Sequence, residues 1–337
     1  MIISFIIPFY NEQDFLYKTL LSIDKQIING FNAEVFLVDG ISTDNSRSII
    51  EEFVNNKVNE YIDYVVLENI NKKVPFAFNL GIEKAAGEII GLGGAHTIYP
   101  PDYFQNVINI LNEIDTDVVG GGHDEFIPGN KSLISKAMTA LYISPLGAGV
   151  APYHRRNNSG FVDTVYGGFY KRDIFKMLGS FNTSLHRMQD YEFNVRVRKA
   201  GYKIYFDPRL HTKYIQRTNL QSLVKRGYKT GFHLPEAWIK DQSTFKIRHV
   251  TPFIFVLYNL FLLFNKFYLG FPQISYLLFY FYLMLLFLSS LWLGISRSYG
   301  FSSLFTIPIF YIYHLSYGIG TLFGLLKASI KSILFKK

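Results

Sequence analysis

Two long apolar runs near the N-terminus each end abruptly in polar residues and lead into a helical pattern. The first is Ile2–Glu12, which reads IISFIIPFYNE, and the second is Glu34–Asp44, which reads EVFLVDGISTD. Continuous apolar runs of this kind are typical of strands buried on both faces of a parallel sheet. Ligands of such sheets bind just beyond the carboxyl ends of the strands. The pattern therefore predicts a binding site among the polar residues that follow each run.

Strands and helices continue to alternate through the first 200 residues. Four further short apolar runs are separated by segments whose apolar residues follow helical spacing. These runs predict the strands Tyr64–Leu67, Ile89–Leu92, Asp117–Gly121 and Val162–Lys171. This order predicts an α/β fold with a mostly parallel central sheet and helices on both faces. Two helices are expected to end in a left-handed C-cap, at Gly87 and at Gly201.

The pattern weakens between Lys131 and Phe161, where glycine, proline, arginine and asparagine become frequent. Neither the helical nor the strand period persists over this stretch. We therefore predict that it is rich in loops.

Charge is distributed unevenly along the chain. All 26 acidic residues precede residue 250, and only six basic residues follow it. Segments 267–296 and 298–326 are uncharged, and Thr251–Leu269 is apolar apart from Asn259, Asn265 and Lys266. Uncharged runs of this length predict membrane-spanning helices. The basic pI of about 9.3 thus points to a membrane and not to nucleic acid, which would need a basic stripe on the folded domain.

The same distribution predicts a folded domain over 1–235, a basic juxtamembrane linker over 236–250 and a membrane region over 251–330 with two or three apolar helices. The basic cluster before the membrane includes Arg217 and Arg226. It suits a lipid diphosphate or anionic headgroups, and it equally suits the bias that keeps a domain cytosolic. Three crossings would put the C-terminal lysines outside, so we expect one apolar segment to lie in the interface or to re-enter.

The residues that end the two long runs are suited to a nucleotide. Asn11, Glu12, Asp39 and Asp44 can accept hydrogen bonds from a base or a ribose. An aspartate before glycine is also typical of a turn, and an aspartate before a helix is typical of a cap. The occurrence of all four together favours nucleotide binding.

Three later segments could complete that site. Lys72 and Lys73 could neutralise a diphosphate, or could simply be solvated. Asn79 lies on the following helix, and the strand after it delivers Gly94 and His96 to the same edge of the sheet. A dinucleotide oxidoreductase would need G-x-G-x-x-G directly after the first strand. That position has no glycine, which excludes this class.

A helix predicted over Met188–Ala200 carries a candidate catalytic base. Asp190 stands in its first turn, where a carboxylate is stabilised by the helix dipole. It could equally deprotonate an acceptor hydroxyl. Glu192, two residues later, points elsewhere on the helix.

These segments, in this order, resemble the family-2 glycosyltransferases of the GT-A fold. The matching motifs are Ile6–Glu12, Val38–Asp44, Asn79–Ile82, Ala86–Ile90, Val162–Thr164, Gly167–Tyr170 and Gln189–Glu192. The tail His314–Gly320 is similar to that of membrane-associated transferases of the succinoglycan-assembly type. The likeness covers nearly the whole chain. It implies a nucleotide-sugar donor, commonly a UDP-sugar, and a lipid-linked saccharide acceptor in polysaccharide biosynthesis.

The resemblance also implies roles for single residues, with Asp190 as the catalytic base of an inverting transfer. It places at the donor Pro8, Tyr10, Asn11, Glu12, Asp39, Asp44, Lys73, Asn79 and Gly94. It places at the acceptor or the phosphates Asp163, Gly168, Gln189, Arg217 and Arg226.

Two motifs depart from the family pattern. The Asp-x-Asp or Asp-x-His metal motif stands here as Gly94-Ala95-His96, without its first ligand. His96 is then either a ligand of a divalent metal, Mn²⁺ or Mg²⁺, or a hydrogen-bond donor near the phosphates, and we expect a weak, Mn²⁺-favouring metal dependence. The Gln-x-x-Arg-Trp motif of processive synthases is absent, which favours addition of one sugar per encounter.

The sequence therefore predicts an inverting glycosyltransferase in the cell membrane, with several membrane passes and a cytosolic catalytic domain. One alternative is transfer of the sugar to polyprenyl phosphate itself. Another is a catalytically inactive, nucleotide-sugar-binding partner in an assembly complex.

Overall fold

The computed structural model describes residues 1–126, 132–144, 146–147, 158–185, 188–215, 219–240, 249–270, 273–296 and 300–334. The chain forms two compact units. The first comprises Met1–Phe126 and Pro152–Ile215, and the second comprises Ile127–Ala151 and Gln216–Lys337. The second unit thus combines the C-terminal helices with a segment from the middle of the chain.

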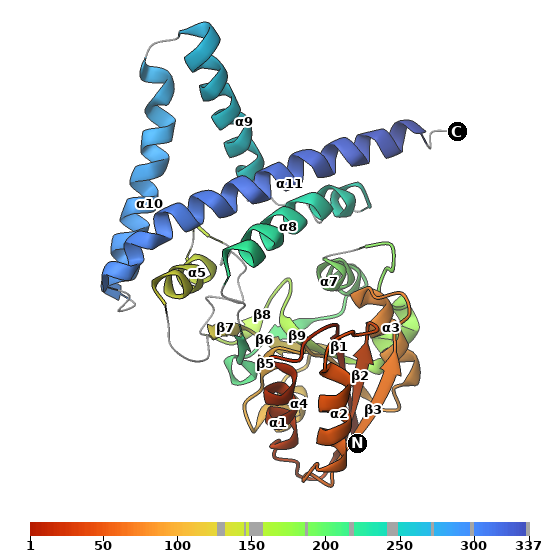
Figure 1. Cartoon of the computed structure of the whole chain (residues 1–337). Coiled ribbons are helices and arrows are strands. Elements are labelled where there is room, and N and C mark those ends of the chain that lie inside the picture. The colour runs from red at the N-terminus through yellow and green to blue at the C-terminus, as the bar shows by residue number, and fades with distance from the viewer. Residues whose placement is uncertain are drawn as a thin grey trace. The chain divides into compact units, whose positions relative to one another are not determined.

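An eight-stranded sheet forms the centre of the first unit (Figure 1). Its strands are β1 (Ile2–Phe9), β2 (Asn32–Asp39), β3 (Ile62–Glu68), β4 (Ile89–Leu92), β6 (Val118–Gly121), β8 (Gly160–Phe161), β9 (Tyr166–Lys171) and β10 (Ile204–Phe206). They are ordered β3-β2-β1-β4-β9-β6-β10-β8. All pairs are parallel except those of β9 with β4 and β6, and that of β8 with β10. The prediction of a mostly parallel sheet is confirmed.

Helices cover both faces of this sheet, because side chains alternate between the faces along each buried strand. Phe5 and Ile7 of β1 join the core with α1 (Leu16–Asp24), α2 (Ser46–Asn55) and α4 (Tyr103–Glu113). Ile6, on the other face, joins the core with α3 (Val74–Lys84), α6 (Arg172–Leu178) and α7 (Gln189–Lys199). Both cores hold the carboxyl ends of β1, β2 and β4 at one edge.

A smaller sheet adjoins the ends of these strands within the first unit. Its three strands are β5 (Thr97–Ile98), β11 (Thr212–Ile215) and β7 (His123–Phe126), in the order β5-β11-β7. Strand β11, which follows the 3-10 helix Pro208–Leu210, pairs with β5. A late segment of the chain therefore lies beside the loop after β4.

One of the two predicted glycine caps is wrong. Gly201 has a positive φ of 88°, as expected for a left-handed helix end. Helix α3, however, ends at an extended Ala85, and Gly87 is not in the left-handed region. A Cβ on Gly87 would lie 2.6 Å from the carbonyl oxygen of Ile2 and from Ser4 Oγ. Glycine is needed there because the backbone passes close to β1 and not because of its φ.

The prediction of a loop-rich stretch is also wrong where the structure describes it. Helix α5 (Leu133–Ile143) occupies part of it, and Ser132 caps the helix by accepting a hydrogen bond from Ser135 N at 3.1 Å. Ala137, Met138 and Leu141 form its buried stripe. The glycine-rich flanks concealed this short amphipathic pattern.

The second unit is helical in the residues that the structure describes. Besides α5 it contains α8 (Leu220–Lys240), α9 (Thr251–Phe264), α10 (Leu277–Ser296) and α11 (Thr306–Leu334). A π-helical turn, Asn265–Leu269, extends α9, and 3-10 turns at Gln273–Tyr276 and Gly300–Phe305 precede α10 and α11. Three of these helical segments are long and apolar enough to cross a membrane, namely Thr251–Leu269, Leu277–Ile295 and Ser303–Ser329.

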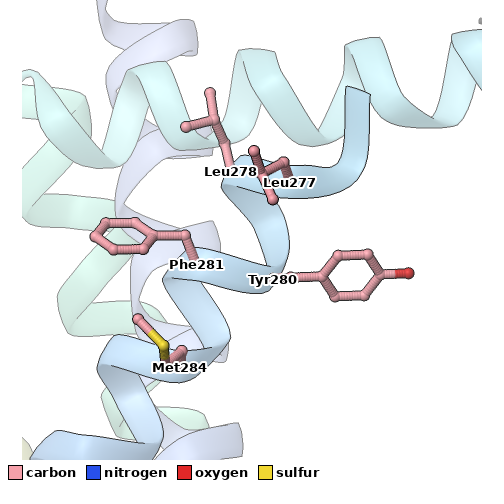
Figure 2. Close-up of a pocket in the computed structure, with 5 residues that line it drawn as sticks. All are labelled: Leu277, Leu278, Tyr280, Phe281 and Met284. Carbon is pink, nitrogen blue, oxygen red and sulfur yellow. The ribbon is translucent and has the colours of Figure 1, made fainter. Parts of the chain in front are cut away.

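The first half of α10 presents an open apolar hollow (Figure 2). It is lined by Leu277, Leu278, Tyr280, Phe281 and Met284, whose side chains are between 47% and 65% exposed. A contiguous exposed apolar surface of this kind is typical of a contact with a membrane or with another protein.

Candidate active site

The loops that follow β1 and β2 are joined by hydrogen bonds. The backbone N–H of Asn11 donates to Ser42 Oγ at 3.0 Å, and the N–H of Thr43 donates to Asn11 Oδ1 at 2.8 Å. Further along, the N–H of Gln13 donates to Asp44 Oδ2 at 3.1 Å. The two motifs predicted to bind a nucleotide thus form one rim at the carboxyl edge of the sheet.

Asp39, at the end of β2, is buried and fully engaged in this rim. Its Oδ1 accepts from Ser42 N at 2.8 Å and from Ser42 Oγ at 2.7 Å. Its Oδ2 pairs with Arg47, which also pairs with Glu68 at the end of β3 at 2.8 Å. The carboxylate closes its own turn and, through Arg47, ties the loops after β2 and β3 together.

Asp44 caps the start of α2. Its Oδ1 accepts from Ser46 N at 3.0 Å, while its Oδ2 accepts from Gln13 N at 3.1 Å. Partial desolvation acts to raise the pKa of Asp44, but the hydrogen bonds from Ser46 and Gln13 outweigh it and lower the pKa. Asp44 is therefore a firmly ionised part of the rim.

Each of the first three loops contains one non-glycine residue in the left-handed conformation. These are Asn11 (φ 54°), Ile41 (φ 62°) and Lys72 (φ 59°). Such residues are uncommon and cluster at functional sites, where the surrounding contacts hold them in place. The Lys72 ammonium lies 6.0 Å from the centre of the Tyr10 ring, and Tyr10 is 47% exposed. An accessible aromatic face and a cation therefore stand together on the rim.

The remaining predicted donor residues lie at the same edge or behind it. Pro8 is the second residue after Ile6, the last residue of β1 paired with β4, so its missing N–H is tolerated on that side. Lys73 is the half-buried N-cap residue of α3. Asn79 uses both ends of its amide on the backbone of Phe181, at 2.9 Å each. In this conformation Asn79 positions the loop after α6.

His96 is held by two hydrogen bonds. Its Nδ1 lies 3.2 Å from Glu12 Oε2, and its Nε2 lies 2.6 Å from Tyr214 Oη. A neutral ring with its proton on Nδ1 satisfies both contacts, since Nδ1–H donates to the carboxylate and Nε2 accepts from the tyrosine. Gly94, at the start of the same turn, donates its N–H to Tyr99 Oη at 2.8 Å. The loop after β4 is thus fixed to β1 and to β11.

This donor set does not fit a preformed metal site. Both ring nitrogens of His96 are engaged, and Gly94 has no side chain to offer. Among the residues that the structure describes, no group of three or more His, Asp or Glu side chains could hold a metal ion. Hard divalent cations prefer several oxygen ligands. Asp163, which the resemblance places at the acceptor or the phosphates, has its Oδ1 3.8 Å from Arg198.

Helix α7 is anchored to β9 and to the segment just before it. Asn194 donates to Thr164 Oγ1 at 2.8 Å and accepts from Tyr170 Oη at 2.8 Å. Thr164 follows Asp163, and Gly168 lies two residues before Tyr170 in β9, where a Cβ would meet the Tyr170 ring at 2.8 Å. Because β9 is antiparallel to β4, its first residues lie at the carboxyl edge of β4, on the side of the rim.

Asp190 lies one helical turn before Asn194 and is exposed to solvent. No ion-pair partner is found for its carboxylate within the described part of the chain, whereas Glu192 pairs with Arg196 at 2.8 Å. Desolvation by the surrounding protein raises the pKa of Asp190. The neighbouring Gln189 has a buried Oε1 that finds no hydrogen-bond partner among the residues that the structure describes. Asp190 as a whole is accessible, while the protein atoms around its carboxylate raise the pKa against backbone hydrogen bonds at Asp190 and Tyr191 that lower it.

The two predicted arginines are not part of this unit's described surface. Arg217 lies outside the described residues. Arg226 belongs to α8 of the second unit, where its guanidinium lies 4.4 Å from the centre of the Tyr142 ring.

Two residues of the candidate site, Arg47 and Tyr214, were not predicted from the sequence. Arg47 could have been found from its place in the first turn of a helix after an aspartate-bearing strand. Tyr214 could not, because it contacts His96 from 118 residues away along the chain.

Residues 4–179 match the family model described as glycosyl transferase family 2. The chain therefore belongs to glycosyl transferase family 2.

Two curated proteins show how this chain compares within the family. It is 28% identical over 234 residues to the Methanococcus voltae dolichyl N-acetyl-alpha-D-glucosaminyl phosphate 3-beta-D-2,3-diacetamido-2,3-dideoxy-beta-D-glucuronosyltransferase, covering 68% of this chain and 71% of that protein. It is 22% identical over 253 residues to the succinoglycan biosynthesis protein ExoA of Rhizobium meliloti, covering 73% of each.

A solved structure shares the fold. The mannosyltransferase PcManGT from Pyrobaculum calidifontis, in complex with GDP-Man and Mn²⁺, matches with a TM-score of 0.59 at 16% identity, over 95% of this chain and 86% of that chain. The protein is a glycosyltransferase of the GT-A fold, and the two curated relatives are named for transfer to a dolichyl-linked sugar phosphate and for succinoglycan biosynthesis.

Proposed function

We propose that this enzyme transfers one sugar, with inversion, from a nucleotide-sugar to a lipid-linked saccharide at the cytosolic face of a membrane. A UDP-sugar is the first donor to test. The observation that carries the proposal is the rim at the carboxyl edge of the sheet, where the loops after β1, β2 and β4 are joined by hydrogen bonds.

The rim supplies the groups that a nucleotide diphosphate needs. Tyr10 offers an open aromatic face to a base, and Asn11 and Asp44 belong to the same rim, where a ribose or base would bind. Asp39 is buried in this rim by its contacts with Ser42 and Arg47. Lys72 and Lys73 lie beside this rim and can offset the charge of the diphosphate. These cations suit a leaving group whose negative charge grows during the reaction.

Asp190 supports the chemical step. In an inverting transfer, the acceptor hydroxyl oxygen attacks the anomeric carbon of the donor. The bond from that carbon to the diphosphate oxygen breaks, the nucleotide diphosphate leaves, and the hydroxyl proton passes to a base. An accessible carboxylate with a raised pKa and no competing cation in the described part of the chain is suited to accept that proton.

The lipid-linked acceptor is supported by the second unit and by the relatives. Three helical segments are apolar enough to enter a membrane, and the M. voltae relative is named as acting on a dolichyl-linked sugar phosphate. Transfer to polyprenyl phosphate itself is the second candidate, since basic residues on α8 precede the apolar helices.

The full-length protein in lipid nanodiscs tests this proposal. We expect it to release nucleotide from one of UDP-GlcNAc, UDP-glucose, UDP-galactose or GDP-mannose when a lipid-linked oligosaccharide extract is present. A product on added polyprenyl phosphate would instead identify the second candidate. Donor binding without turnover on any acceptor would identify an inactive binding partner, and absence of donor binding would contradict the proposal.

We expect transfer to continue in excess EDTA, because neither ring nitrogen of His96 is open to a metal. Direct metal titration of the purified protein should then show no tight Mn²⁺ site. Gly94→Asp restores the family carboxylate and should introduce measurable Mn²⁺ binding, although its Cβ would lie 3.1 Å from Thr97 Oγ1. Activity lost in EDTA and recovered with Mn²⁺ would show that a ligand outside this donor set completes a metal site.

A further inference from the structure

Helix α8 has two unlike sides. Its exposed side carries Lys225 and Lys229, one turn apart. Gly227 and Gly231 are buried, and they lie about 200° around the helix from these lysines, given 100° per residue. The lysine side therefore needs polar surroundings, while the glycine side is open to close contact with another helix.

Helix α11 presents matching glycines to that side, and the two helices lie side by side (Figure 1). A Cβ on Gly231 would overlap the carbonyl oxygen of Tyr317 in α11. Conversely, a Cβ on Gly320 or on Gly324 would overlap a carbonyl oxygen of α8. The two backbones touch through a Gly-x-x-x-Gly pair on each helix, an arrangement that permits unusually close helix packing.

Through this contact, the second half of α11 packs against a charged helix, α8. Lys327 of α11 lies 5.0 Å from the centre of the Phe232 ring in α8. Helix α8 also contains Arg226 and Glu236, and charged side chains are rare in helices that cross the hydrocarbon core. A helix packed backbone to backbone on α8 shares its depth in the membrane.

The other two apolar helices are placed differently. Only 17% of the most apolar window of each of Thr251–Leu269 and Leu277–Ile295 is buried, against 50% of that of Ser303–Ser329. Helices α9 and α10 both contact the first half of α11, where Tyr311 Oη donates to Asn259 Oδ1 at 2.9 Å, Gly318 closely approaches the carbonyl oxygen of Pro252, and Tyr282 Oη lies 2.9 Å from His314 Nδ1. Beyond these contacts, α9 and α10 extend away from α11 (Figure 1). They form an exposed apolar hairpin, with the hollow lined by Tyr280 and Phe281 on its surface.

We infer that α9 and α10 alone cross the membrane, as a hairpin, and that α8 and α11 lie together in the interface on the side of the catalytic unit. The inference rests on the proposed membrane location. It names the bilayer interface as the partner of the α8–α11 pair. Of the three apolar segments, the one that remains in the interface is the last, Ser303–Ser329.

The charges of the C-terminal segment fit this arrangement. With two crossings, Lys327, Lys331, Lys336 and Lys337 stay on the same side as the catalytic unit. Cytosolic flanks of membrane helices are enriched in lysine and arginine. Three crossings would place all four on the opposite side.

The chain contains no cysteine, so single-cysteine variants can report topology without a background signal. Suitable positions are Gln273→Cys between α9 and α10, Leu304→Cys before α11, and a cysteine appended after Lys337. Lys18→Cys, exposed on α1, marks the catalytic unit. Intact and permeabilised cells expressing each variant would be treated with a membrane-impermeant maleimide.

We expect Gln273→Cys alone to react in intact cells, and the other three to react only after permeabilisation. Labelling of the appended cysteine in intact cells would overturn the inference and establish three crossings. Labelling of Leu304→Cys but not Gln273→Cys would also overturn it, because α10 and α11 would then be the hairpin. Fractionation separates this question from the proposed function, since a protein absent from the membrane pellet would refute the membrane location itself.

The helix contact can be tested in the same membranes. Gly227→Cys with Ser316→Cys should cross-link on mild oxidation, since a Cβ on Gly227 would touch the Ser316 side chain. Lys229→Cys with Ser316→Cys, on the opposite side of α8, is the matched control and should not. Equal cross-linking of both pairs would contradict the packing of α8 on α11.

Discussion

Asp190→Asn is expected to lower turnover by about 10²-fold or more while donor affinity stays within a factor of about two. Asparagine keeps the shape of the side chain and can still accept hydrogen bonds at the start of α7, but it no longer accepts a proton. Turnover would be measured as nucleotide release with a competent acceptor, and donor binding by calorimetry. Glu192→Gln is the matched control, because it neutralises a carboxylate two residues away that pairs with Arg196. A rate for Asp190→Asn close to that of the control would remove Asp190 from the mechanism.

The pH profile offers a second readout of the same residue. A base works in its deprotonated form, so kcat/KM should fall as the pH drops through the pKa of Asp190. Desolvation raises that pKa, so the acidic limb should begin at a higher pH than for an ordinary aspartate. Asp190→Asn should remove this limb, whereas Glu192→Gln should keep it.

Asp39→Ala is expected to weaken nucleotide binding by about 1–3 kcal/mol, the scale of a lost hydrogen bond to a charged group. This corresponds to roughly 5- to 150-fold in Kd. The substitution removes the carboxylate, and with it both any contact with the nucleotide and the hydrogen bonds from Ser42. Calorimetric titration with UDP measures the effect.

Arg47→Ala separates the two roles of Asp39. It removes the ion pair of Asp39 with Arg47 and leaves the aspartate in its turn. If Asp39 contacts the nucleotide, Arg47→Ala should bind UDP more tightly than Asp39→Ala does. An equal loss of UDP affinity in the two variants would mean that Asp39 acts only by holding the loops together. Unchanged UDP binding in both would mean that Asp39 is only a turn residue.

Local pattern was enough to determine the class of the fold and to predict at which edge of the sheet the candidate site lies. The runs Ile2–Glu12 and Glu34–Asp44 are buried strands with polar ends, and parallel strands bring such ends to one edge whatever the rest of the chain does. The apolar segments after residue 250 could likewise be recognised, because length and lack of charge are properties of the sequence itself. The motif order pointed to family 2, and the match over residues 4–179 confirmed it.

Only the tertiary structure decided which partners the site residues have. From the sequence, Asp39 could be either a turn residue or a nucleotide-binding residue. Its burial against Arg47 depends on how α2 packs beside β2. His96 reads as a metal ligand until Tyr214 and Glu12 occupy its ring, and these contacts bridge 118 and 84 residues. The pairing of α8 with α11 depends on glycines that carry no hydrophobic signal. Such contacts arise from packing between distant segments, which local periodicity does not encode.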